Sequence, residues 1–193
     1  MESEWKENKL GAICKFQEGY VNPSQTNPKY FEGNIKWLRA NDLNNSNIYD
    51  TSRTLTQEGF DSAGKSALLF KPNTIVISKS GTIGRLGILK DYMCGNRAII
   101  NIQPNENQNV LFIFYLLKSF QKHFEDFAVG SVQKNLYVPI LANIKFQIPS
   151  IKTQNNIVKI LHSIDKKIEL NNKINNNFFS NILFLLVFSK VFL

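Results

Sequence analysis

The feature that most constrains this chain is a proline break followed by a long amphipathic segment. A short apolar run ends at Ile148-Pro149. Proline disfavours helical structure at the residue before it, so the run is separated from any helix that follows. From Lys152 the apolar residues recur at helical spacing, which predicts a helix with one apolar face. That face consists of Ile157, Ile160, Leu161, Ile164 and Ile168, and the pattern continues at Ile174 and Phe178. The a/d-like spacing is typical of a coiled-coil arm, although Lys167 and Asn171 interrupt it.

The chain divides into two expected parts, a domain over residues 1–150 and a helical spacer or dimerisation arm over residues 151–193. At 193 residues, of which 43% are hydrophobic, it is long enough to bury one core and carry one extension. The tail over residues 178–193 is nearly all apolar, but it is shorter than the roughly 20 residues that cross a bilayer. We expect this tail to be buried or to contact a partner, with no membrane association.

The first 150 residues mix strand and helix patterns. Short apolar and β-branched runs predict strands over residues 9–14, 35–40, 74–78, 86–89 and 98–102, and residues 144–148 close the domain. The turn at Lys71–Asn73 predicts a hairpin that joins residues 67–70 to 74–78. Two helices are expected, a short one over 54–60 that Gly59 ends and an aromatic-rich one over 110–127.

Groups that carry catalysis or bind metals are sparse. Cys14 and Cys94 lie in no paired motif, so we expect two buried thiols and neither a disulfide framework nor a zinc site. His123 and His162 each precede an aspartate by three residues, but no second histidine or cysteine completes a metal set. Nucleophile elbows, Walker loops, dinucleotide fingerprints and the Asn/Asp-Pro-Pro-Tyr/Phe motif of amino-methyltransferases are missing from the sequence. The pattern predicts a chain that is not an enzyme by itself.

Charge indicates a polyanionic partner. The formal net charge is +8 and the isoelectric point is about 9.5, which favours nucleic acid or an acidic membrane surface. The positive charge is spread over both expected parts of the chain. A basic patch can therefore form only where folding brings cationic residues together. The polar, acidic start Met1–Lys6 does not resemble a signal peptide, and a cytoplasmic location is therefore expected.

Cationic and amide side chains in predicted loops are candidates for contacts with DNA phosphates and base edges. They are Gln17, Tyr20, Arg39, Asn41, Arg53, Lys79, Ser80, Thr82, Arg85, Ser131, Gln133, Lys134 and Asn135. The segment Lys79–Arg85 is the strongest, because its two glycines let the backbone approach a phosphate and a cation stands at each end.

Each candidate also has a structural interpretation. Arg39 and Arg53 are equally well explained as solvated side chains, and Asn41 as part of an Asx-type turn with Asp42. The segment 130–135 is equally well a tight connection fixed by Gln133, or a contact with DNA or a partner subunit. Arg97, at the start of a strand, is expected to be paired inside the fold.

An ordered set of residues resembles the specificity subunit of type I restriction-modification systems. The set comprises Trp5, Leu10, Gly11, Cys14, Gln17, Gly19 and Tyr20, then Ser78–Gly84, Asn96–Ala98, Gly130–Leu136, Ile148-Pro149, Gln154 and the helix through Asn171. The resemblance covers nearly the whole chain up to about Asn175. It implies a DNA target-recognition domain of mixed α+β (α/β) fold, with a mixed or mainly antiparallel sheet and flanking helices, followed by a long coiled-coil-like helix.

Membership of that family implies double-stranded DNA, adenine methyltransferase subunits and a restriction subunit as partners. S-adenosylmethionine, ATP and magnesium are then expected on those partner subunits, and no cofactor on this chain. A full subunit has two recognition domains whose helices pair antiparallel, whereas this chain has one. It is therefore a half-size subunit that forms a homodimer through its C-terminal helix, a silent exchange cassette, or a truncated reading frame, and the apolar tail departs from the family.

Two other functional classes remain open. An independent DNA-binding regulator shares the basic charge but is expected to show a helix-turn-helix or ribbon motif, which the sequence lacks. A membrane-attached interaction protein would use residues 178–193.

Overall fold

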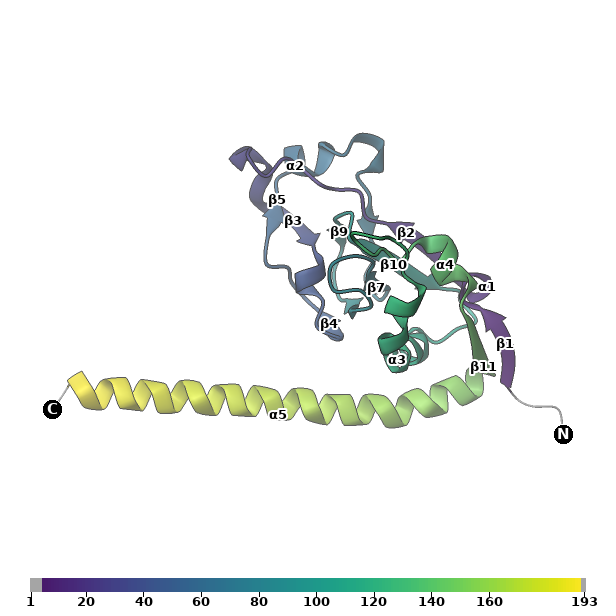
Figure 1. Cartoon of the computed structure of the whole chain (residues 1–193). Helices are drawn as coiled ribbons and strands as arrows, with labels where there is room; N and C mark the ends of the chain where they lie inside the picture. The colour runs from purple at the N-terminus through teal and green to yellow at the C-terminus, as the bar shows by residue number, and fades with distance from the viewer. Residues whose placement is uncertain (1–4, 192–193) are drawn as a thin grey trace. The chain divides into compact units, whose positions relative to one another are not determined.

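The computed structural model describes the backbone of residues 5–191 and the side chains of residues 5–175 and 178. Its contacts divide the chain into two units, Met1–Gln154 and Asn155–Leu193. The first unit combines three sheets with short helices, and the second is a continuation of one long helix (Figure 1). The expected mixed α+β fold with a long C-terminal helix is confirmed.

The largest sheet has five strands in the order β2 (Cys14–Glu18), β10 (Ile99–Pro104), β7 (Ile75–Ser78), β8 (Leu86–Leu89) and β4 (Ser46–Ile48). All neighbours in it are antiparallel except β4 and β8, which are parallel. Every residue of β7 and β8 is buried, as expected for β-branched and leucine-rich strands in the middle of a sheet.

A second sheet of four strands has the order β5 (Thr54–Leu55), β3 (Phe31–Leu38), β9 (Met93–Gly95) and β6 (Leu69–Phe70). The predicted hairpin between residues 67–70 and 74–78 is wrong, because β6 pairs with β9 and not with β7. Both edges of β7 are already occupied by β8 and β10, so the turn at Lys71–Asn73 connects two different sheets.

The third sheet pairs β1 (Trp5–Lys9) with β11 (Lys145–Pro149) in antiparallel register. The strand predicted over residues 9–14 is wrong, because one helical turn, α1 (Leu10–Ile13), separates β1 from β2. Leu10 and Ile13, three residues apart, are both buried in the turn. The turn contacts α4 (Val138–Asn143), and Leu10 N donates to Ile144 O at 2.9 Å.

The remaining helical elements of the first unit are short. They are η1 (Pro28–Tyr30), η2 (Ala40–Asp42), α2 (Gln57–Asp61), η3 (Gly64–Ser66), α3 (Val110–Ser119) and η4 (Gln121–Phe127). Gly59 does not end the predicted short helix but lies inside α2, where a Cβ would come 2.2 Å from Tyr30 O. The predicted helix over 110–127 is split, because the chain tightens to 3₁₀ geometry after Phe120, whose ring contacts Phe124 and Phe146.

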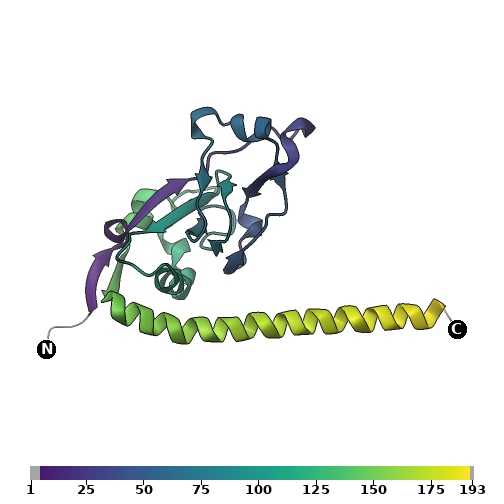
Figure 2. The same cartoon turned by 180° about the vertical axis from the view of Figure 1, so that it is seen from behind.

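Apolar side chains fill the space between the sheets. One cluster contains Leu38, Phe70, Val76, Leu89 and Met93, and another contains Val21, Phe31, Trp37, Leu55 and Cys94. The second cluster lies directly beneath the candidate residues Arg39 and Arg53, so the core positions them (Figure 2 gives the reverse view of the sheets).

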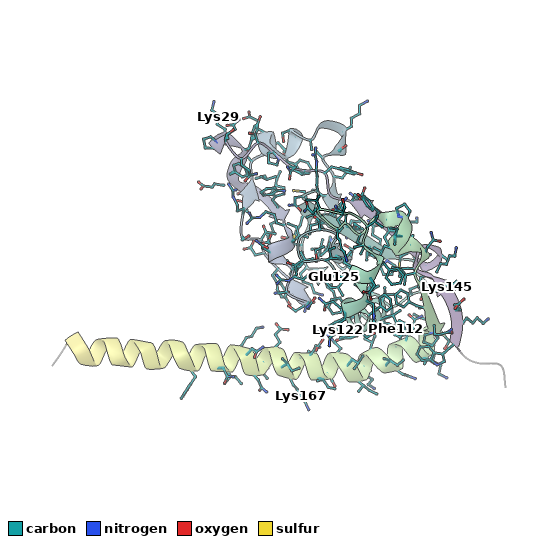
Figure 3. The ribbon with its side chains drawn as sticks, in the orientation of Figure 1. Lys29, Phe112, Lys122, Glu125, Lys145 and Lys167 are labelled. Carbon is teal, nitrogen blue, oxygen red and sulfur yellow. The ribbon has the colours of Figure 1, made fainter. Side chains whose placement is uncertain are left out.

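Helix α5 spans Ile151–Val191. Ile160, Ile164 and Ile168 are between 49 and 64% exposed, and Lys167 also points outward (Figure 3). The tail for which burial or a partner contact is expected has its side chains beyond Phe178 outside the described residues. Within the described part of the chain, no helix combines the length and apolarity required to cross a membrane.

Candidate nucleic-acid interface

The loop between β7 and β8 is a tight turn with an exposed tip. Ser78 closes its base, because Ser78 N donates to Arg85 O at 2.9 Å and Arg85 N donates to Ser78 Oγ at 3.0 Å. Gly81 has a φ of +75° and open space around the position of a Cβ, while Thr82 is exposed. Arg85 is half-buried and its guanidinium makes no hydrogen bond or ion pair with the described residues.

A second loop, residues 130–135, lies against the first. It is closed by two hydrogen bonds of 2.9 Å between the backbones of Val129 and Asn135. Gly130 has a φ of +139°, and a Cβ there would lie 2.2 Å from Gln133 O, so only glycine fits without strain. The next residue, Leu136, is fully buried, and its N donates to Lys79 O at 2.8 Å. We call residues 79–85 and 130–135 together the two-loop surface.

The exposed residues of this surface are polar apart from one. Ser131, Gln133 and Lys134 are exposed, and Val132 between them is fully exposed. Asn135 is half-buried, and its Nδ2 donates to Gln133 O at 3.2 Å, which stiffens the tip. The structure thus brings eight of the predicted residues together: Lys79, Ser80, Thr82, Arg85, Ser131, Gln133, Lys134 and Asn135.

Lys79 is joined to the end of β2 by an ion pair. Its Nζ donates to Glu18 Oε1 at 2.5 Å, and Tyr20 Oη donates to Glu18 Oε2 at 2.6 Å. Burial alone raises the pKa of Glu18, but the hydrogen bonds from Lys79 and Tyr20 and the Lys79 charge outweigh it and hold that pKa below its ordinary value. The hydrogen bond to Glu18 and its charge raise the pKa of Tyr20. The charge of Lys79 is therefore already balanced within the fold.

Arg39 and Arg53 lie over the aromatic rings of Trp37 and Phe31, and we call these four residues the Trp37 region. The guanidinium carbon of Arg53 is 3.9 Å from the Phe31 ring centroid, and that of Arg39 is 5.4 Å from the Trp37 ring centroid. Arg53 Nη1 also donates to Gln25 Oε1 at 2.7 Å. The two arginines are thus held in place rather than freely solvated.

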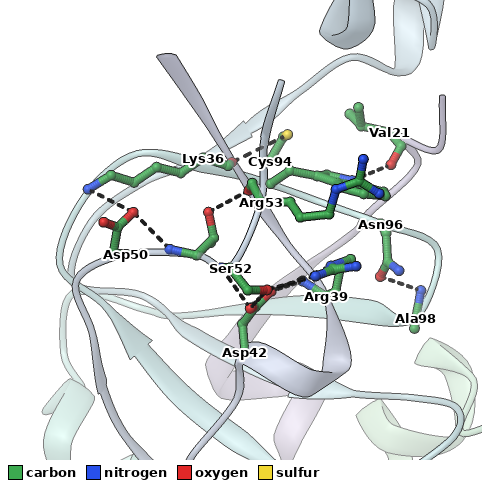
Figure 4. A network of polar contacts seen from close by, with 12 residues as sticks. Val21, Lys36, Arg39, Asp42, Asp50, Ser52, Arg53, Cys94, Asn96 and Ala98 are labelled. Carbon is green, nitrogen blue, oxygen red and sulfur yellow. Dashed lines mark hydrogen bonds and ion pairs between the residues drawn. The ribbon is translucent and has the colours of Figure 1, made fainter. Parts of the chain in front are cut away.

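Asp42 organises the turn that carries Arg39 (Figure 4). Its Oδ2 accepts from Arg39 N at 2.8 Å, its Oδ1 accepts from Ser52 N at 3.0 Å, and Arg39 Nη2 donates to Ser52 Oγ at 2.7 Å. The expectation that the Asn41 side chain forms the turn is wrong, since the Asp42 carboxylate bonds the backbone instead. Asn41 itself is exposed.

The two regions are connected through the segment after β2. Trp37 Nε1 donates to Val21 O at 2.8 Å, and Val21 N donates to Gly95 O at 3.1 Å. Tyr20 thus lies between Lys79 on one side and the Trp37 region on the other. Gly19 permits this close approach, because a Cβ there would come 2.3 Å from Asn96 O.

Two sequence interpretations need correction. Gln17 is not in a loop but inside β2, where its Oε1 accepts a long 3.4 Å bond from Gln103 Nε2. Arg97 is not paired inside the fold but exposed. With Tyr20, Asn22, Ser62 and Ser66, it lines an open polar hollow of about 240 Å³.

Sequence reasoning missed this hollow. Its lining comes from three separate segments, after β2, around η3 and before β10. Two of its lining residues are singled out by the sequence, but separately: Tyr20 as a candidate for DNA contact and Arg97 as a residue expected to be paired inside the fold.

Both cysteines are buried in the fold, whereas His123 is exposed. Cys14 and Cys94 are buried, as expected, and burial raises the pKa of each thiol to about 12. His123 Nδ1 lies 3.6 Å from the exposed Asp126 carboxylate. Among residues 5–175, no group of three or more metal-binding side chains comes together.

Known proteins share this fold. A chain from a structural study of complex assembly and conformational transition in a type I R-M system superposes with a TM-score of 0.67 at 16% identity, covering 88% of this chain and 40% of that one. The HsdS subunit from Thermoanaerobacter tengcongensis gives a TM-score of 0.61 at 15% identity, covering 88% of this chain and 39% of that subunit. At these identities the likeness concerns the fold.

Sequence comparison is more specific. The chain is 26% identical over 190 residues to the type I restriction enzyme MjaIX specificity subunit of Methanocaldococcus jannaschii, which covers 90% of this chain and 44% of that subunit. This chain thus spans less than half the length of that relative. The model of the type I restriction modification DNA specificity domain matches residues 2–177. On this match, the chain belongs to the type I restriction-modification DNA specificity domain family.

Proposed function

We propose that this chain binds double-stranded DNA sequence-specifically and directs the other subunits of a type I restriction-modification system to their target. The observation that carries the proposal is the family match, which spans both the two-loop surface and the first 27 residues of α5. A net charge of +8 supports a polyanionic partner.

The proposed DNA-binding face comprises the two-loop surface, Tyr20 and the Trp37 region. Ser80, Thr82, Gln133 and Lys134 offer hydroxyl, amide and ammonium groups suited to base edges and phosphates. Arg39 and Arg53 add guanidinium groups that aromatic stacking has already oriented, which reduces the entropy lost on binding. Gln17 and Asn41 flank this face, the first on β2 and the second on η2.

Catalysis belongs to partner subunits in this proposal. An adenine methyltransferase subunit would carry S-adenosylmethionine, and a restriction subunit would carry ATP and magnesium. The chain itself supplies target recognition, in the cytoplasm.

The apolar stripe on α5 is the proposed partner or dimer surface. Ile160, Leu161, Ile164 and Ile168 are between 36 and 64% exposed, and Ile157 on the same face is half-buried. Such a stripe favours coverage by another helix, because water contact with it is unfavourable. A second copy of α5 in a twofold homodimer would provide that helix.

Selection from a random-sequence pool tests the DNA-binding proposal. The full chain, alone and with the adenine methyltransferase subunit of its system, is incubated with random duplexes, and the bound fraction is sequenced over several rounds. We expect one short sequence to be enriched. Binding without enrichment of any sequence, or no binding in either preparation, would contradict the proposal.

A further inference from the structure

The polar hollow beside the Trp37 region is lined by three side chains whose hydrogen-bond donors have no partner among the described residues. Ser62 Oγ donates its proton to Gly59 O at 2.6 Å, and Tyr20 Oη donates its proton to Glu18. The protons that remain available belong to the Arg97 guanidinium, the Asn22 amide and the Ser66 hydroxyl. None of these three side chains has a hydrogen-bond or ion-pair partner among the described residues.

The electrostatic surroundings favour an anion. Arg97 contributes the positive charge of its guanidinium to the lining. Glu18, the carboxylate that bonds Tyr20, is balanced by Lys79. Asp61, next to Ser62 in the chain, accepts two hydrogen bonds of 3.0 Å from Gln57.

A phosphate group matches this set of donors. Its oxygens only accept hydrogen bonds, and arginine, asparagine and serine are common phosphate contacts in protein–DNA complexes. The hollow is open and has a volume of about 240 Å³, which leaves room for a backbone phosphate with its neighbouring sugar atoms. It adjoins Tyr20, which connects it to the two-loop surface through Glu18 and Lys79.

We propose that the hollow formed by Arg97, Asn22 and Ser66 binds one backbone phosphate of the target DNA and thereby fixes the register of the recognition domain. This inference rests on the proposed DNA-binding function. It assigns Arg97 a positioning role that carries no base preference of its own.

The test uses the full chain and the duplex enriched from the random pool. Removing one phosphate contact should flatten the dependence of log affinity on log salt by about 0.9 units. We expect Arg97→Ala to do so and to weaken binding about tenfold, as for loss of one charge-assisted hydrogen bond. Arg97→Lys should keep the slope and recover part of the affinity. Lys71→Ala, which removes one exposed charge outside the hollow, should leave both nearly unchanged.

Neutral methylphosphonates, placed at one duplex position at a time, identify the phosphate. We expect one position at which this replacement weakens the wild type about tenfold but hardly affects Arg97→Ala. Thermal unfolding of the variant should match the wild type, since Arg97 is exposed.

The outcomes separate this inference from the proposed function. If the wild type selects a sequence but Arg97→Ala keeps its affinity and salt slope, the hollow does not bind phosphate and DNA recognition stands. If Arg97→Ala changes the preferred base at one position, Arg97 contacts a base and the phosphate assignment is wrong. If the wild type binds no duplex, the proposed function fails and the inference fails with it.

Discussion

At the scale of single residues, Glu18 holds together the parts of the proposed interface. Its carboxylate accepts from Lys79 and from Tyr20, and the backbone of Lys79 in turn holds Leu136 and the second loop. The sequence marks Lys79 and Tyr20 as candidates for DNA contact but gives no sign of Glu18, because a carboxylate is an unexpected residue on a DNA-binding face. Its importance follows from geometry alone.

The Glu18 ion pair should make stability depend on pH. A carboxyl group whose pKa is lower in the folded chain than in the unfolded chain stabilises the fold at pH values above its unfolded pKa. That contribution is lost as the pH falls through the folded pKa. We expect the wild type to exceed Glu18→Gln by about 1 kcal/mol in free energy of unfolding at pH 7, given partial solvent screening. The difference should shrink as pH falls below the ordinary Glu18 value of 4.5. Urea denaturation at several pH values measures it, and a constant difference would exclude the pair as its source.

Gln154 is a second residue whose role is visible only from its hydrogen bonds in the folded chain. It is 1% exposed, its Oε1 accepts from Asn109 N at 2.9 Å, and its Nε2 donates to Gln108 Oε1 at 2.9 Å and to Pro149 O at 3.0 Å. Gln154→Leu should lower the free energy of unfolding by about 1–3 kcal/mol, because the buried polar partners of Gln154 lose their hydrogen bonds. Gln147→Leu is the matched control, since Gln147 is exposed. Equal stability of the two variants in urea denaturation would contradict this role.

At the scale of elements, the two cations of the loop between β7 and β8 are proposed to contact phosphates unequally. Arg85 has no partner among the described side chains, whereas Lys79 is paired with Glu18. Replacing both by Ala should flatten the salt dependence of DNA affinity by about one to two units. Arg85→Ala alone should account for most of this change. Fluorescence titrations at several salt concentrations measure the slope, and an unchanged slope in the double variant would mean that this loop lies away from DNA.

The α5 stripe gives a prediction about association. Ile160→Asp with Ile164→Asp would introduce unpaired charges into a covered apolar seam, so the chain should become monomeric or fail to recruit the methyltransferase subunit, while the recognition domain stays folded. Asn156→Asp with Ser163→Asp adds the same two negative charges at exposed positions off the stripe. Sedimentation velocity compares the three proteins. Unaltered association and recruitment in the isoleucine variant would mean that no partner covers the stripe.

The elements differ in how far sequence predicts them. The β-branched run Ile75–Ser78 and the helix after Pro149 were predictable, because strong periodicity and a proline break are local signals. The pairing of β6 with β9 was not, since strand partners depend on which edges remain free. The prediction that Gly59 ends a helix is wrong for a similar reason. Gly59 packs closely against Tyr30, which is about 30 residues away in sequence.

At the scale of the whole molecule, the interface is an assembly of segments far apart in the chain. The segments after β2, before β10 and around residues 79 and 136 meet through backbone hydrogen bonds that no motif spacing reveals. The sequence nevertheless singles out eight of the residues on the two-loop surface, because turn-rich polar segments with glycines are recognisable locally. Arg97 and the hollow were misread, since their neighbours come from three different segments.

Directed methylation tests the central claim most directly. Three reactions contain genomic DNA and S-adenosylmethionine together with the adenine methyltransferase subunit of the same system, with this chain, or with both proteins. Methylated adenines are then mapped by sequencing. We expect methylation at one defined sequence only when both proteins are present, and a symmetric bipartite sequence with a fixed gap if α5 pairs two copies. Methylation at the same sites without the chain, or by the chain alone, would contradict its role as the specificity component.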